Sequence, residues 1–484
     1  MFWIFASVIY PSRGSRLRAS QSRGFSFRKL FVPLFAVALI LSVQTPAFAW
    51  SEHALGAYPA LSVLPEIAQA PAVRVEALED FLRAEEAGLI ALLKAEEAWS
   101  RENLTAYGPR PDELAFTAAP PGETDAQLRL RFLYALRVNP EIRLQYYVQM
   151  LPGGECGVRP VQSYKTISIF SEENSRALAR TRFCALKPGA TVTPLEVAAT
   201  AIDEPDYGHD INLWTDSASE FGPKYGFDTL PFGDPKLYYS TQAPFHMGFY
   251  HEAGILYLVA GFLKRTYPKH RARLYGRLAQ FAFQTGHDYW GYRFLGWGLH
   301  YITDLTQPYH ATVVPGLSTG YMLWVNLIAM LGWTGPKERA IQLVSNRHTA
   351  LEEFQMQMMQ RAYRSEAPEK NPVIAATERS AADANVPPYD DRYIEDVITK
   401  QSYGQSGAID EALTAYLPEH FVSDPDYRFP PAERDQVYDE VVKNRKDAVE
   451  KMNAALVELF ESFGVHARSY ARYVLAQRKA APAK

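Results

Sequence analysis

The sequence lacks a strong excess of charge of either sign, and it shows no internal repeat. Its 50 lysine and arginine residues nearly balance 54 aspartate and glutamate residues, which gives a formal net charge of -4. A protein with this balance has no general positive field to attract nucleic acid, which argues against a dedicated DNA-binding protein. An enzyme that cuts nucleic acid needs only a local basic groove, so the composition does not exclude one.

Cysteine is scarce, with Cys156 and Cys184 as the only two in 484 residues. We expect the segment that contains them to be exported, and disulfides persist outside the reducing cytosol. The favoured interpretation is one bridge between them, and two buried thiols are the alternative.

The N-terminal region has no apolar run long enough to cross a bilayer, since a membrane-spanning helix needs about 20 residues. A basic region ends at Lys29, an apolar run covers residues 30–43, and small residues of the A-x-A type end at Ala49. This pattern predicts a signal peptide over 1–49 that is removed on export. The mature protein, secreted or periplasmic, would then begin with Trp50; an uncleaved anchor is the alternative.

Apolar residues at helical spacing are what the chain has in abundance. Of its 484 residues, 47% are apolar, which is enough to bury one large core or two smaller ones. The texture changes between 142 and 184, where short apolar runs on either side of a Gly153-Gly154 turn predict a small β-hairpin. The expected fold is otherwise all-α, with helices over 74–101, 126–137, 251–265, 269–285, 289–305 and 433–478, the last as one helix or two.

Candidate metal ligands concentrate between residues 296 and 311. His300 and Asp304 are four residues apart, so a helix places both side chains on one face. Pro308 then ends the helix, and His310 can turn back toward the same point. Nitrogen and oxygen donors that converge in this way suit zinc, whereas a surface pair is the bland alternative.

A second pair repeats this spacing on another expected helix. His348 and Glu352 are again four residues apart, with the lone His310 before them in the chain. Two such pairs and the intervening histidine could hold more than one metal ion.

Together these segments resemble the zinc-dependent phospholipase C / P1 nuclease family. The hallmarks of that family are a mature N-terminal Trp, a nearby His, an Asp in a Pro-Asp context, a further His, the segment His-x3-Asp-x5-His and a final His-x3-Glu or His-x3-Asp. Each has a candidate here, in the family's order. The resemblance implies an all-helical bundle that holds three zinc ions and hydrolyses phosphodiesters.

Carried over residue by residue, the resemblance implies a first zinc site with two histidines and two carboxylates. Its ligands would be Asp206, His300 and Asp304, together with either His246 or His251. We favour His246, because His251 stands beside Glu252 at the start of an expected helix.

The resemblance also implies two further zinc sites. The second site would be formed by His310, His348 and Glu352, with room for water or substrate beside them. The third would be formed by His53, a bridging Asp304, and the amino nitrogen and carbonyl oxygen of Trp50.

The reaction explains why such a set is needed. A phosphodiester is anionic, and its displacement adds negative charge that adjacent divalent cations neutralise while they lower the pKa of a bound water toward 7. The predicted catalytic carboxylates are Asp206, which would orient or deprotonate the attacking water, and Asp304.

Three features favour a phospholipid as the substrate. Glu352 as the last carboxylate ligand and the sequence Pro308-Tyr309-His310 resemble the phospholipases of the family more than its nucleases. Residues 321–333 form a strongly apolar segment that, if exposed, could make a peripheral membrane contact through Trp324 and Trp333. A buried core helix is the alternative for that segment.

Other functions remain as alternatives. A single-strand nuclease of the same fold would stack bases on an aromatic, basic groove. A third possibility, of a different class from these two enzymes, is a cell-envelope protein that binds metal without catalysis. A phosphohydrolase of the HD type, built on His209-Asp210 and His287-Asp288, is disfavoured because it leaves His310 and the second pair unexplained. We expect His209 and His287 to be surface or packing histidines.

The resemblance also sets the expected domain organisation. The catalytic domain would cover 50–365, with an inserted segment at about 60–195, because the span from the first histidine to Asp206 is long. Residues 366–484 match no module, and their pattern predicts a helical extension that packs back on the catalytic domain.

Overall fold

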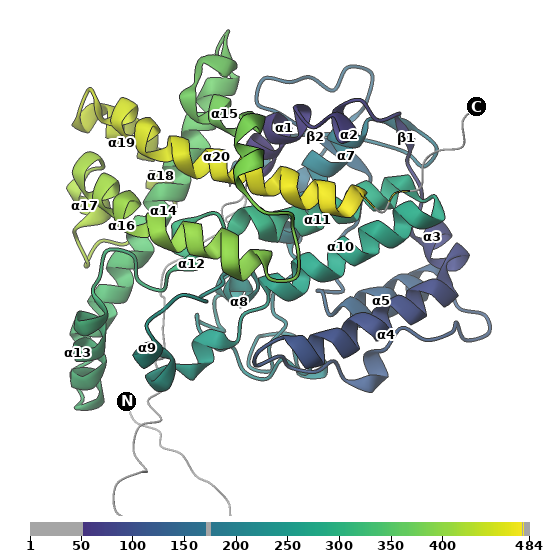
Figure 1. Ribbon diagram of the computed structural model, residues 1–484, viewed down its shortest axis with the longest axis horizontal. Coiled ribbons are helices and arrows are strands. Elements are labelled where there is room, and N and C mark those ends of the chain that lie inside the picture. Colours follow the sequence, from purple (N-terminus) through teal and green to yellow (C-terminus); the bar gives the residue numbers. More distant parts are fainter. Residues whose placement is uncertain (1–51, 171–175, 477, 479–484) are drawn as a thin grey trace, which may run out of the picture. The chain divides into compact units, whose positions relative to one another are not determined.

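Helices dominate the structure. The computed structural model describes residues 52–170, 176–476 and 478, and it consists of 61% helix and 3% strand (Figure 1). This composition agrees with an all-α fold that carries a small β element. The phospholipase C-like bundle remains a prediction.

The helices of the described chain fall into three successive stretches. The first stretch comprises α1 (Ala54–Ser62), α2 (Pro65–Ala68), α3 (Leu78–Ala84), α4 (Glu86–Asn103), α5 (Asp125–Leu136), α6 (Arg176–Arg180) and α7 (Pro194–Ala201). The second comprises α8 (Ala243–His246), α9 (Gly254–Val259), α10 (Pro268–Thr285), α11 (Asp288–Asp304), α12 (Pro308–Ala311), α13 (Thr319–Met330) and α14 (Gly335–Tyr363). The third comprises α15 (Pro372–Thr377), α16 (Thr399–Tyr416), α17 (Glu419–Val422), α18 (Pro431–Arg434), α19 (Val437–Asn444) and α20 (Ala448–Leu475).

Short turns of tighter or wider helix connect these elements. The 3-10 turns are η1 (Asp112–Leu114), η2 (Tyr164–Thr166), η4 (Pro205–Tyr207), η5 (Gly222–Lys224), η6 (Tyr238–Gln242), η7 (Gly261–Lys264), η8 (Pro368–Lys370) and η9 (Ser380–Asn385). A π-helical turn, η10 (Ile394–Ile398), leads into α16.

Three expected helices agree closely with α5, α10 and α11, and three are broken. The expected helix over 251–265 is reduced to α9 and η7, because glycine opens each of these short pieces and weakens helix formation. The expected helix over 74–101 begins as strand and is interrupted at Glu85, whose φ of -116° is not helical. The C-terminal stretch over 433–478 divides into the end of α18, α19 and α20, with an extended break at Arg445.

A small antiparallel sheet lies where the hairpin was expected. It has the strand order β2 (Tyr147–Met150), β4 (Arg182–Ala185), β3 (Val161–Gln162). Cys184 of β4 pairs in register with Val148 and Val161, and it forms a disulfide with Cys156, which confirms the predicted bridge. A second, two-stranded sheet of β1 (Val73–Arg74) and β5 (Thr191–Val192) was not anticipated.

Helix α11 is the centre of the core. Every residue of α11 after Asp288 is buried, including the polar side chains of His300, Thr303 and Asp304. It packs on α10, α7 and α20. Close approach depends on glycine: a Cβ at Gly296 would lie 2.6 Å from Ala201, and one at Gly298 would lie 2.0 Å from the Tyr470 hydroxyl.

The C-terminal helices share this core. Figure 1 shows α20 lying across the molecule, and its residues Tyr470 and Val474 belong to the same buried cluster as α10 and α11. Helix α20 also packs on α1, where a Cβ at Gly56 would lie 2.8 Å from Phe463. Both ends of the described chain thus meet beside α11.

Among the described residues, no helix combines the length and the apolar character that crossing a membrane requires. The predicted signal peptide over 1–49 and the predicted ligand Trp50 lie outside the described residues.

Candidate metal centre

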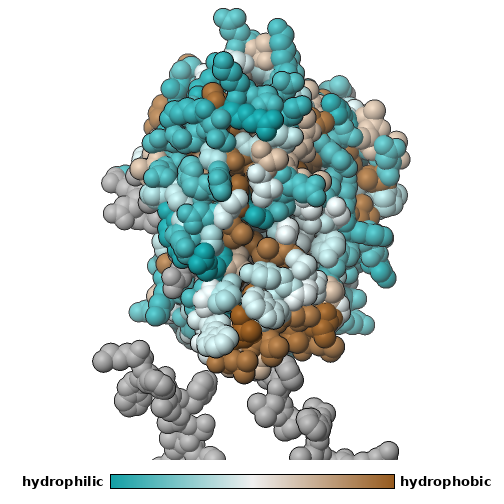
Figure 2. Space-filling model, turned by 90° about the vertical axis from the view of Figure 1, so that its left-hand side faces the viewer, coloured by the Kyte–Doolittle hydropathy of each residue, from teal (hydrophilic) through white to brown (hydrophobic). Residues whose placement is uncertain are grey.

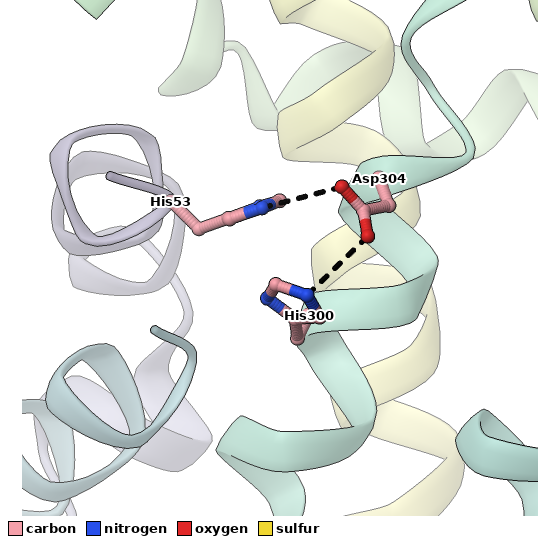
Figure 3. Close-up of side chains that lie close together, drawn as sticks. All are labelled: His53, His300 and Asp304. Carbon is pink, nitrogen blue, oxygen red and sulfur yellow. Dashed lines mark ion pairs between the residues drawn. The ribbon is translucent and has the colours of Figure 1, made fainter. Parts of the chain in front are cut away.

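His300 and Asp304 lie one helical turn apart at the end of α11. Both are completely buried, and His300 Nε2 lies 3.3 Å from Asp304 Oδ2. Figure 3 shows them pointing toward His53, which approaches from the start of α1. The chain leaves α11 and begins α12 at Pro308, which brings His310 back to Asp304 with 3.1 Å between Nδ1 and Oδ1. The proline therefore places His310 as the sequence predicts.

A first group of metal-ligand type joins Asp206, His246 and His300, whose nearest ligand atoms all lie within 4.8 Å of one another. Asp206 lies in η4, just after α7, and His246 ends α8. His246 Nδ1 lies 3.0 Å from His300 Nε2 and 2.7 Å from Asp304 Oδ2. Asp206 Oδ1 lies 3.7 Å from His300 Nε2. Three segments far apart in sequence thus meet at one point.

A second group joins His310, His348 and Glu352. The i, i+4 pair on α14 points its His348 Nε2 to within 2.8 Å of Glu352 Oε1. His310 Nε2 lies 3.2 Å from His348 Nε2 and 3.3 Å from Glu352 Oε1. Tyr309 stacks on the His348 ring with 5.3 Å between centroids, which fixes the plane of that imidazole.

A third group joins His53, His300 and Asp304. His53 directly precedes α1 and is fully buried, with Nε2 at 3.4 Å from Asp304 Oδ1 and 4.0 Å from Asp206 Oδ2. The short spacing after Trp50 does not keep His53 away from the other side chains.

Asp304 connects all three groups. Its Oδ2 faces His246 and His300, whereas its Oδ1 faces His53 and His310. One carboxylate therefore stands between several sets of nitrogen donors, in the position of a bridging ligand.

The arrangement of donor atoms suits a cation. Hydrogen bonds to the Nδ1 atoms of His300 and His53 determine that their Nε2 atoms carry the lone pair. The backbone carbonyl of Ile202 can only accept, so His300 donates to it from Nδ1 at 2.8 Å. The Thr303 hydroxyl donates to the carbonyl of Leu299 or His300, and so accepts from His53 Nδ1 at 2.8 Å. In the neutral rings, both Nε2 lone pairs then point at carboxylate oxygens, an arrangement that needs a positive charge between them.

Asp206 points to the same conclusion. Its carboxylate is buried, and among the described residues neither of its oxygens has a hydrogen-bond partner. A buried carboxylate without partners is costly unless it meets a cation. Burial raises the pKa of Asp206 well above its ordinary value.

Burial and neighbouring charges push the histidine pKa values apart. Burial lowers the pKa of His53 and lowers that of His300 much further. For His246 and His310 burial is the largest single effect and opposes charge, but the neighbouring carboxylates, with Asp304 first among them, together outweigh it and raise the pKa values to about 10 and about 9. Without a metal ion, the protonated His246 and His310 supply the positive charge that balances the buried carboxylates.

A buried ion pair supports the first group from behind. Asp210 Oδ2 lies 3.6 Å from His246 Nε2, and Asp210 Oδ1 accepts from Arg271 at 2.6 Å. The Tyr301 hydroxyl donates to Asp210 as well. A carboxylate behind a ligating histidine orients the ring and raises its basicity.

His251 lies apart from all three groups. Its Nε2 donates to the Glu395 carbonyl at 2.8 Å and lies 3.1 Å from the Thr399 hydroxyl. Of the two histidines considered for the first site, the structure brings only His246 to the other side chains.

The two histidines without a motif position also lie elsewhere. His209 is buried edge-on against Trp297, with 4.6 Å between ring centroids, and burial lowers its pKa to about 3. His287 is half-buried, with Nδ1 at 2.7 Å from Glu76. Both match the expectation of packing or surface roles.

Sequence reasoning missed the supporting roles of Thr303 and Asp210. Thr303 precedes Asp304, but its partner His53 is 250 residues away in sequence. Asp210 was considered only with its neighbour His209, although its side chain serves His246. No local spacing signals either contact.

The chain matches no protein family, no curated protein and no solved structure with which it was compared. The case for function therefore rests on the residues and their geometry.

Proposed function

We propose that this protein is an exported zinc-dependent phosphodiester hydrolase, similar to phospholipase C, that cleaves phospholipid headgroups. The observation that supports it most is the convergence of three groups of histidine and carboxylate side chains on Asp304 in a buried cluster. Imidazole nitrogens and carboxylate oxygens are typical zinc donors.

The assignment of ions follows the groups. Asp206, His246, His300 and Asp304 would hold one zinc ion, and the amino terminus of Trp50 would complete another beside His53. The remaining ion would be held by His310, His348 and Glu352. Bound zinc ions would neutralise charge on the phosphodiester and act as Lewis acids.

The chain's own residues would then have separate tasks. Asp206, with both oxygens in the cluster, orients the attacking water and takes its proton. Asp304 fixes the spacing of the donors, since its two oxygens face different histidines. Asp210 holds the orientation of His246.

The test combines metal content with activity on the secreted protein. We expect the chain to start at Trp50, to bind zinc at close to three ions per chain, and to release phosphocholine from phosphatidylcholine. A chelator should abolish this release and zinc should restore it. Full activity in metal-free protein would overturn the proposal, and cleavage of single-stranded DNA without cleavage of lipid would favour the nuclease alternative.

One substitution tests the bridging carboxylate. Asp304→Asn should lower zinc content and reduce hydrolysis of a water-soluble phosphodiester at least about 100-fold, because it weakens more than one group at once. Asp112→Asn is the matched control, since the Asp112 side chain is fully exposed and belongs to none of the three groups. Wild-type zinc content in Asp304→Asn would contradict the assignment.

A further inference from the structure

The segment over 321–333, which could have been a buried core helix, exposes much of its apolar surface. Trp333 and Leu331 are each 72% exposed, and Trp324 is 51% exposed. Figure 2 shows apolar side chains gathered at the lower edge of this side of the molecule. We name as the apolar face the exposed residues Ile255 and Leu258 of α9, Tyr321, Trp324, Leu327 and Met330 of α13, and Leu331 and Trp333 just after it.

The size of the apolar face is unusual for a surface in contact with water. A tryptophan side chain has about 150–250 Å² of surface, so Trp324 and Trp333 alone expose on the order of 250 Å². Soluble proteins rarely expose contiguous apolar patches beyond a few hundred Å², and larger ones mark interaction sites.

Charged residues are missing from both segments that build the apolar face. Residues 311–336 contain no Asp, Glu, Lys or Arg, and neither do residues 253–263. The second stretch is preceded by the buried Glu252 and followed by Lys264, which is exposed, and Arg265; Lys337, Glu338 and Arg339 follow the first. A charge-free face with more basic than acidic side chains at its border is complementary to a lipid surface with anionic headgroups.

An apolar cavity borders the second group of candidate ligands. It has a volume of about 90 Å³, and His348 is part of its wall. Val313, Val314, Val344 and Phe249 also line it.

The helices of the apolar face pack on the walls of this cavity. Met322 and Val325, on the inner side of α13, pack with Val314 and Val344. The side chains of α9 cluster with Val313. A molecule that inserts between these walls would have its polar end at His348.

We propose that the apolar face docks on a phospholipid surface, and that the cavity receives the apolar part of the same lipid beside His348. This inference rests on the proposed function and specifies how the protein would reach its lipid substrate. A lipid surface explains the two exposed tryptophans, since Trp is enriched at headgroup depth, and it explains the basic border. A second copy of the chain on the apolar face would instead leave the cavity without an apolar occupant.

The experiment compares two triple variants. Trp324→Ser/Leu331→Ser/Trp333→Ser removes exposed side chains of the apolar face. Its matched control, with exposed apolar residues replaced at the same number of positions elsewhere, is Leu130→Ser/Val158→Ser/Val442→Ser. Circular dichroism and melting temperature verify that both are folded.

Binding is measured by sedimentation with vesicles of phosphatidylcholine and phosphatidylglycerol, and hydrolysis is measured on the same vesicles and on a water-soluble phosphodiester. The apolar-face variant should lose vesicle binding and vesicle hydrolysis at least about tenfold, while hydrolysis of the soluble substrate stays at the wild-type rate. The control should behave as wild type. A smaller share of phosphatidylglycerol should weaken binding through the loss of anionic headgroups.

The outcomes separate the two proposals. If the wild type cleaves the soluble phosphodiester but does not bind vesicles, the docking inference is wrong, and the part of the proposed function that makes the protein a phosphodiester hydrolase stands. If it binds vesicles but cleaves no phosphodiester, docking stands and the proposed function fails. A dimer in solution that the apolar-face variant abolishes would show that a second copy covers the face, which also overturns the inference.

The cavity has its own test. Val344→Trp would fill the cavity but replaces none of the candidate ligands, so hydrolysis of long-chain lipid should fall at least about fivefold more than hydrolysis of the soluble phosphodiester, which also reports any disturbance of His348 in the cavity wall. Equal loss on both substrates would contradict the assignment of the cavity to the apolar part of the lipid.

Discussion

The two oxygen atoms of Asp304 face different histidines, and this geometry sets the charge of the cluster. The pKa values of His246 and His310 are raised to about 10 and about 9, so in metal-free protein both imidazoles hold protons at neutral pH. Under the proposed function, zinc would have to displace those protons, so we expect acid to weaken its binding.

Thr303 offers a sharp test of one ligand. Thr303→Val keeps the shape of the side chain but removes the acceptor for His53 Nδ1, so His53 is no longer held with Nε2 toward Asp304. We expect one bound zinc ion to weaken by about 10–100-fold, measured by competition with a chromophoric chelator.

Thr414→Val is the control for this prediction. Within the described part of the chain, the Thr414 hydroxyl bonds only to carbonyls of its own helix, α16. Unchanged affinity for every ion in Thr303→Val would show that His53 does not need this support.

The candidate site could be predicted from sequence where the contacts are local. The i, i+4 spacing places His300 with Asp304 and His348 with Glu352, because a helix repeats every 3.6 residues. The choice between His246 and His251 could not be made with certainty, since it depends on where α8 ends and α9 begins.

At the scale of elements, α11 is positioned by contact with α20 at Gly298. A methyl group there would meet the Tyr470 hydroxyl at 2.0 Å, and that hydroxyl is held by a bond to the Ala272 carbonyl. We expect Gly298→Ala to cost about 1–3 kcal/mol and to lower the melting temperature and zinc content together.

Two variants complete this prediction. Gly407→Ala, in α16 with open space around it, should keep or slightly raise the melting temperature, because alanine favours helix. Adding Tyr470→Phe to Gly298→Ala removes the clashing oxygen and should restore part of the loss. A wild-type melting temperature in Gly298→Ala would contradict the close contact.

Helix α20 also carries a buried histidine with a pH effect. Burial lowers the pKa of His466 to about 4, from 6.5 in an unfolded chain. The unfolded state therefore binds a proton first as pH falls, so the free energy of unfolding declines below pH 6.5 and levels off below pH 4. His466 should account for about 2 kcal/mol of loss between pH 7.5 and pH 5.

The measurement is urea unfolding of the wild type and His466→Gln at both pH values. The wild type should lose more stability than the variant on acidification, by about that amount. Equal losses would show that His466 is protonated at a similar pH in both states.

The element boundaries show what periodicity can predict. The periodic stretches over 269–285 and 289–305 predicted the ends of α10 and α11 to within a residue or two. The breaks at Glu85 and Arg445 carry no glycine or proline, so tertiary packing sets them and the local sequence does not reveal them.

At the scale of the whole molecule, bound metal should support the fold. Without cations the cluster buries the carboxylates of Asp206, Asp304 and Glu352, and ligands that bind only the folded state stabilise it. We expect chelation to lower the melting temperature by about 10 °C or more and zinc to restore it, measured by calorimetry. Calcium at the same concentration is the control, and equal recovery with calcium would argue against a nitrogen-rich site.

The arrangement of the C-terminal helices could be predicted only in outline. Their packing against the rest follows from their apolar faces, but the contact of α20 with α1 joins Gly56 to Phe463 across nearly the whole chain. Such pairings depend on the complementary shapes of distant segments, which no window of sequence displays.

That contact also has a consequence for how the candidate site assembles. His53 stands at the start of α1, and α1 packs on α20, which begins far along the chain at Ala448. A chain truncated before α20 would lack this support for α1. Under the proposed function, such a truncated chain should therefore bind less metal than the full chain, because its N-terminal candidate ligand is no longer held in place.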